Sequence, residues 1–202
     1  MARKLILIAW MATMSLGMAA QLSVEQRINV IHQDYAERLN LMQNQPYDDD
    51  SDAVERLTVS YNRMYPGTGM ARFTDTYYWS DDENEEYMLK PTLYYVTSSY
   101  TMNSGLYRFN REYLFDALTE EPMFIYVTTQ VGDDGKRQEY RFYFDKGKLI
   151  RQIPEKIMPV NDDELNPEIS VDKNGRAVVS SLLGEFKKIK SRFHDIIPTY
   201  AW

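Results

Sequence analysis

The chain has 202 residues and a net charge of −7 at neutral pH, since 30 aspartates and glutamates outnumber 23 lysines and arginines. An acidic chain of this kind is a poor candidate for binding nucleic acid or anionic lipid surfaces, so we expect neither partner. Cysteine is absent, which excludes disulfides, thiol chemistry and lipid attachment at a cysteine in this chain, whereas tyrosine is abundant, with 16 residues.

The first twenty residues, MARKLILIAWMATMSLGMAA, have the pattern of a secretory signal peptide. Arg3 and Lys4 precede an apolar run, and small residues follow it, with cleavage expected after Ala19 or Ala20. The run is too short for a comfortable membrane span, which needs about 20 residues. A retained N-terminal anchor is the alternative.

We therefore divide the chain into a signal peptide, residues 1–20, and a single domain, residues 21–202. The short positive segment, the lack of cysteine and the lack of an N-x-[ST] glycosylation site together favour a bacterial exported protein. No later segment is apolar enough to span a bilayer. The expected location is the periplasm or the exterior of the cell, with no membrane span after cleavage.

The segment after the signal peptide predicts an amphipathic helix. Ser23 and Gln26 have the spacing of a capping box at its start. The helix should end near Asn44, because Pro46 disfavours helical backbone before it. Its apolar residues recur at steps of three and four: Val24, Ile28, Ile31, Tyr35, Leu39 and Met42.

The apolar period changes to two between residues 57 and 153, as in β-strands. Tyrosine, phenylalanine, valine and threonine are frequent here, and they suit a pleated surface. The separators are short and turn-like, which favours antiparallel pairing because a parallel crossover needs a dozen or more residues. The expected strands cover residues 56–65, 69–79, 88–100, 105–115, 123–131, 138–145 and 148–153.

The stretch EYRFYFDKGKLIRQIPE predicts a hairpin. Phe142 and Phe144 share one face of its first strand, and Tyr143 lies on the other. The Lys-Gly pair that follows can form a two-residue turn, which would place Asp145 opposite Lys148. A three-residue loop with a glycine bulge is the alternative. We expect the two phenylalanines to face the helices.

The C-terminal part predicts a linker and a second helix. Residues 154–175 contain three prolines and an acidic run. Pro198 should end the helix that follows. The apolar residues of this helix again recur at steps of three and four: Val179, Leu182, Phe186, Ile189, Phe193 and Ile196.

Catalytic motifs are absent from the sequence. His32 and His194 are the only histidines, so neither a three-histidine zinc site nor an H-E-x-x-H motif is possible. No G-x-S-x-G nucleophile motif occurs. We expect no catalytic residue, no metal and no other cofactor. A hydrolase that uses two of the many carboxylates is a remote alternative.

Acidic segments occur at residues 48–52, 81–86 and 161–164, and we interpret them as solvated loops rather than calcium sites. None has the spacing of an EF-hand. Residues 170–175 come near that spacing, but the twelfth position is Ser181, which cannot supply the bidentate carboxylate.

Several predicted strands carry aromatic residues on both faces, with Tyr95 opposite Tyr94 in the third. A sheet that is wet on one side should instead alternate cleanly between apolar and polar residues. If two helices cover one face, then curvature, a partner or a ligand must close the other. Tyr78, Tyr94 and Tyr143 are the candidate ligand or partner surface on that second face.

The expected fold is an α+β domain with a curved antiparallel meander sheet of six to eight strands. An N-terminal and a C-terminal amphipathic helix flank the sheet, and we expect both on the same side. The leading hypothesis is an exported, non-catalytic binding or interaction protein of the bacterial cell envelope, whose partner is an envelope protein, a glycan or a lipid. The alternative is a periplasmic carrier that holds a lipid or other apolar ligand in a half-barrel cavity.

Overall fold

The computed structural model covers most of the predicted domain. The predicted signal peptide (residues 1–20) and two of the acidic segments (48–52 and 161–164) lie outside the described residues, as does the end of the third (84–86). The residues that the structure describes are 22–43, 55–66, 69–83, 88–102, 106–132, 135, 137–158, 169–197 and 200–201.

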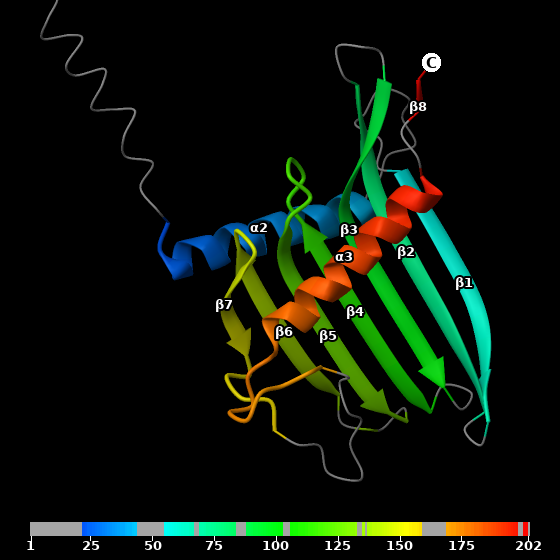
Figure 1. Ribbon diagram of the computed structural model, residues 1–202, viewed down its shortest axis with the longest axis vertical. Coiled ribbons are helices and arrows are strands. Elements are labelled where there is room, and N and C mark those ends of the chain that lie inside the picture. The colour runs from blue at the N-terminus through cyan, green and yellow to red at the C-terminus, as the bar shows by residue number, and fades with distance from the viewer. Residues whose placement is uncertain are drawn as a thin grey trace, which may run out of the picture.

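An open antiparallel meander forms the centre of the fold, and Figure 1 shows its strands lying side by side with a marked twist. Seven strands follow one another across the sheet in chain order, and a short eighth strand pairs with the start of the third. The predicted fold class is confirmed. The strands are β1 (Glu55–Tyr65), β2 (Gly69–Glu83), β3 (Met88–Met102), β4 (Tyr107–Phe115), β5 (Pro122–Val131), β6 (Gln138–Asp145), β7 (Lys148–Ile153) and β8 (Tyr200–Ala201).

The two helices also form where the sequence predicts them. Helix α2 (Val24–Gln43) begins with the expected capping box, since the Gln26 amide donates to the Ser23 hydroxyl at 3.2 Å and the Ser23 amide donates to the Gln26 side chain at 2.9 Å. Helix α3 (Val179–Ile196) occupies the predicted range, with no side-chain cap at its start.

The helices lie on opposite faces of the sheet, so the expectation that they share one side is wrong. Figure 1 shows α3 crossing in front of the strands and α2 crossing behind them. Leu182, Phe186, Ile189 and Phe193 of α3 pack on one set of strand residues, which includes Phe142. The apolar residues of α2 pack on the alternate set, which includes Tyr143. The aromatic pattern on both faces arises because each face carries its own helix.

A β-bulge changes the faces predicted for β3. Tyr78 pairs with Tyr95 and Trp79 pairs with Leu93, so Tyr94 is the extra residue between them. Tyr94 and Tyr95 therefore both belong to the core under α2, and the prediction that they oppose each other is wrong. A bulge shifts the alternation by one residue, and nothing in the local sequence marks its position.

The predicted β6–β7 hairpin forms, and of the two turns considered it has the two-residue one. Lys146 and Gly147 both have positive φ, as a type I′ turn requires, and Asp145 pairs with Lys148. Phe144 is fully buried against α3, in agreement with its predicted face.

Candidate binding surfaces

The three tyrosines predicted to form a ligand or partner surface lie together on the side of the sheet that α2 covers. Tyr94 and Tyr143 are each only 1% exposed. Tyr78 is partly buried, with its ring centre 5.8 Å from that of Tyr95. In this conformation the three side chains belong to a core, because α2 excludes solvent and partners from them.

Each of the two buried tyrosines contacts a polar residue of α2. The Tyr143 hydroxyl lies 2.9 Å from Nε2 of His32, and burial raises the pKa of Tyr143. The Arg38 guanidinium lies over the Tyr94 ring, 4.7 Å from its centre. Burial raises the pKa of Tyr94 as well, and its hydroxyl has no hydrogen-bond partner among the described atoms.

Glu112 joins α2 to the sheet through two more tyrosines. Tyr35 of α2 and Tyr95 of β3 both donate their hydroxyls to the same oxygen, Oε2 of Glu112. Burial raises the pKa of both tyrosines, and the nearby carboxylate raises it further. Phenols held in this way are hydrogen-bond donors rather than proton donors or nucleophiles, so the cluster attaches the helix to the sheet.

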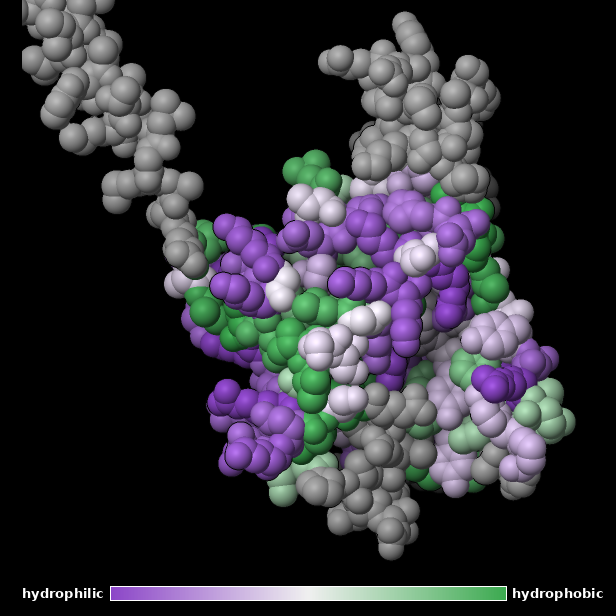
Figure 2. Space-filling model, in the orientation of Figure 1, coloured by the Kyte–Doolittle hydropathy of each residue, from purple (hydrophilic) through white to green (hydrophobic). Residues whose placement is uncertain are grey.

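A second group of aromatic side chains lies on the α3 side of the sheet, beyond the reach of the helix. Tyr61, Phe73, Tyr100 and Phe109 occupy matching positions in β1 to β4, and we call them the aromatic row. Figure 2 shows this face, where pale side chains of intermediate hydropathy cover the lower ends of the first strands below α3. Tyr61 is 46% exposed, and the rings become more buried toward Phe109.

The rings of the aromatic row stack on one another across the strands. The centres of neighbouring rings are 4.9, 4.9 and 4.5 Å apart, and their planes are within 16° of parallel. Stacked rings occupy each other's faces, so the row presents ring edges toward solvent. On the other side of the same strands, hydroxyl pairs such as Ser60 and Thr74 replace the aromatic residues.

The row is the part of the molecule that sequence reasoning missed. Its four residues sit at strand-compatible positions, but only the registers of three strand pairs bring them into one line. Arg63 lies near the end of the row, with its guanidinium 5.1 Å from the centre of the Tyr65 ring. Met64 and Met70 pair at the same end of the sheet and are 70% and 50% exposed.

Glu120 is the centre of the main charged cluster. Its carboxylate accepts hydrogen bonds from Lys190 at 2.7 Å, from His194 at 3.1 Å and from the Leu93 amide at 2.9 Å. Burial alone would raise the pKa of Glu120, but these three donors outweigh it and hold the pKa below 4.5. The cluster ties α3 to the β3 and β5 side of the sheet.

Metal-binding groups are not found in the described part of the chain: no three histidines, aspartates or glutamates there come together as ligands. The segment that resembles an EF-hand forms a closed turn, in which Asp172 Oδ1 accepts from the amides of Asn174 and Arg176 at 2.7 and 3.0 Å. The Oδ1 atom of Asp172 is therefore hydrogen-bonded within the turn.

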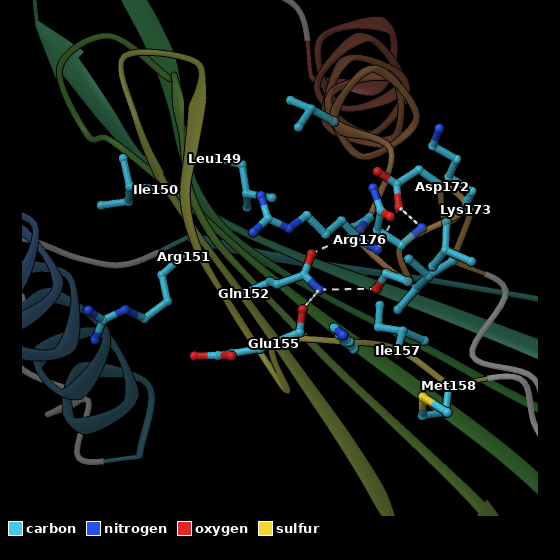
Figure 3. A pocket seen from close by; sticks show the side chains of 17 residues that line it. Leu149, Ile150, Arg151, Gln152, Glu155, Ile157, Met158, Asp172, Lys173 and Arg176 are labelled. Carbon is cyan, nitrogen blue, oxygen red and sulfur yellow. Dashed lines mark hydrogen bonds between the residues drawn. The ribbon is translucent and has the colours of Figure 1, made fainter.

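A cavity of about 1290 Å³ lies at the edge of the sheet beside β7. Figure 3 shows Gln152 at its centre, bonded to the chain on either side. The Gln152 side chain accepts from the Ala177 amide at 2.9 Å and donates to the Glu155 carbonyl at 2.8 Å. Charged residues such as Lys156 and Arg176 line the cavity together with Ile157. It is an open, mixed polar and apolar depression.

Comparison with family models, with characterised proteins and with solved structures finds no match to this chain. Among the residues that the structure describes, no helix is long and apolar enough to cross a membrane.

Proposed function

We propose that the chain is an exported, non-catalytic binding protein of the bacterial cell envelope, and that it binds its partner through the aromatic row. The observation that carries the proposal is the position of the row: four stacked rings run along the α3 side of the sheet from the buried Phe109 to Tyr61, which is nearly half exposed. Exposed tyrosine on a rigid sheet gives a large contact area at low entropic cost.

The chemistry of the row favours a protein partner over a glycan. Sugars stack on the faces of aromatic rings, and the faces within the row are already occupied by neighbouring rings. The row offers ring edges and tyrosine hydroxyls, and Arg63 lies near it on the same face of β1. Tyrosine and arginine are enriched at protein interfaces.

The experiment compares native mass spectra of the full chain recovered from its own host. The wild-type chain should carry a protein partner, and Tyr100→Ala should lose it while circular dichroism still shows a folded domain. Ser99→Ala is the matched control, because Ser99 neighbours Tyr100 on the opposite face of β3. Retention of the partner by folded Tyr100→Ala would show that the row is not the binding surface.

A carrier for an apolar ligand is the second candidate, and the cavity beside β7 is the observation that favours it. Ile157 and Ile169 line that cavity and are almost fully buried. A small bound mass in the native spectrum, lost in Ile157→Asp and kept in Tyr100→Ala, would support the carrier in place of the row.

A further inference from the structure

The first strand of the sheet has an open edge. β1 pairs with β2 along its whole length of 11 residues, without proline and without a bulge. In the described part of the chain no strand pairs with its other side. Such an edge presents a row of backbone donors and acceptors to any extended chain, and proteins usually shorten, bend or cover it.

The opposite edge of the sheet, at β7, is shorter and is tied to the following chain near its end. The Gln152 side chain bonds the Ala177 amide and the Glu155 carbonyl, and the segment that contains Ala177 lies along the strand. Ile153, the last residue of β7, is followed by Pro154, which has no amide hydrogen to offer. The two edges therefore differ: β7 has six residues and ends at a proline, whereas β1 is a regular strand of 11 residues whose outer side has no partner among the described residues.

The side chains of β1 on the α3 side are complementary to themselves in reverse order. They run Glu55, Leu57, Val59, Tyr61 and Arg63, with an acid at one end, a base at the other and apolar residues between them. An antiparallel copy of this sequence brings opposite charges together at both ends.

We propose that β1 pairs with β1 of a second copy of this chain. The two strands are antiparallel, and the twofold axis passes between the two Val59 residues. Glu55 then lies opposite Arg63 of the second copy, and Leu57 lies opposite its Tyr61. Each pair occurs twice because the axis exchanges the copies. All these residues stay on one face, so both α3 helices lie on the same side of a continuous sheet.

Neighbouring registers fit less well. An axis through Ser60 would place Leu57 opposite Arg63 and leave Glu55 without a cation. An axis through Tyr61 would place Val59 opposite Arg63. The register centred on Val59 matches charge with charge and apolar residue with apolar residue.

The pairing also closes the exposed end of the aromatic row. Tyr61 stacks on Phe73 within its own sheet, and its outer side faces the open edge. In the pair, Leu57 of the second copy covers that side. Within its own sheet, this Leu57 lies opposite Tyr77, which is fully buried. An apolar row would thus run from one core to the other.

The test is sedimentation of the full exported chain at micromolar concentration, for the wild type and for charge variants. The wild type should be a dimer. Glu55→Arg and Arg63→Glu should each raise the dissociation constant about tenfold, since each replaces two ion pairs by two like-charge contacts. The double variant, or an equimolar mixture of the two single variants, should restore wild-type association.

Arg56→Glu is the control, because it changes the net charge as much as Arg63→Glu but lies on the other face of β1. The proposed register places Arg56 opposite Asn62 of the second copy, so no ion pair is changed. Arg56→Glu should leave the dimer intact, and melting curves should show all variants folded. A monomeric wild type, or a dimer indifferent to both single charge changes, would overturn the proposal. Partner binding through the row is tested with a different variant, Tyr100→Ala. Either proposal can therefore be contradicted without the other.

Discussion

At the scale of single residues, Tyr143 shows how one side chain serves packing and polarity together. Its ring is buried against Phe124, with the ring centres 4.9 Å apart, and its hydroxyl reaches His32 on α2. A buried hydroxyl that loses its partner costs about 1–3 kcal/mol. The side chain therefore fixes the position of α2 as well as filling space.

Replacing Tyr143 tests both roles. Tyr143→Ala should lower the free energy of unfolding by about 3–5 kcal/mol, as truncation of a buried aromatic residue does. Tyr143→Phe should lower it by about 1 kcal/mol, because only the hydrogen bond to His32 is lost. Denaturant melts measure both. Phe144→Ala should be equally costly, because Tyr143 and Phe144 are buried on opposite faces of the same strand.

Glu120 should make stability depend on pH in the acid range. Its pKa in the folded state is lower than 4.5, so the unfolded chain takes up the proton first as the pH falls. The stabilisation is therefore complete above about pH 4.5 and is lost as the pH falls through the folded pKa. Urea melts should show the difference between the wild type and Glu120→Gln shrinking below that pH.

Glu121→Gln is the control for this experiment. Glu121 adjoins Glu120 in the chain but its side chain is exposed, and it should leave the acid dependence unchanged. A constant difference between the wild type and Glu120→Gln from neutral to acid pH would show that the carboxylate is not stabilised by its three donors.

At the scale of elements, α3 is a helix held by its apolar side. Phe186 meets the rings of Tyr113, Phe115 and Phe144 edge-on, with centre distances between 5.1 and 5.7 Å. Both helices add polar contacts to their apolar packing. Lys190 and His194 of α3 bind Glu120, and Tyr35 of α2 donates its hydroxyl to the carboxylate of Glu112.

Substitutions on the buried and the exposed side of α3 should differ in their effect on stability. Phe186→Ala should destabilise the domain by about 3–5 kcal/mol, since it removes a ring that is 3% exposed. Lys188→Ala, on the exposed side of the same helix, should change stability by less than about 0.5 kcal/mol. Equal small losses in denaturant melts would contradict the packing described for α3.

At the scale of the whole molecule, the two faces of the sheet carry one helix each, and the outer side of β1 has no strand partner in the described part of the chain. A meander with both faces covered needs no disulfide for stability, which is consistent with a chain without cysteine. Both proposed contacts lie at β1 and the exposed end of the aromatic row, where Tyr61 is 46% exposed and the outer side of β1 has no strand partner among the described residues.

Export is a prediction about the whole chain. N-terminal sequencing of the protein recovered from the cell envelope or the medium should begin after Ala19 or Ala20, because small residues precede both positions. A variant in which both Ala19 and Ala20 are replaced by Arg should slow cleavage at either site, and Gln21→Ala is the control. A chain that starts at Met1 and stays with the membrane would refute the predicted signal peptide.

The sequence by itself determined the elements, because each depends on local rules. The capping box at Ser23, the turn at Gly147 and the range of α3 follow from residues a few positions apart. The alternation of Phe144 and Tyr143 was predicted correctly for the same reason, since side chains alternate along any strand.

Only the tertiary structure decided which elements meet. An amphipathic helix must bury its apolar side, but its sequence does not determine which face of the sheet it covers. Helix α2 packs on the face opposite α3. The bulge at Tyr94 and the line formed by the aromatic row depend on registers between strands. Those registers are set by the packing of both faces at once, a long-range condition that no local pattern contains.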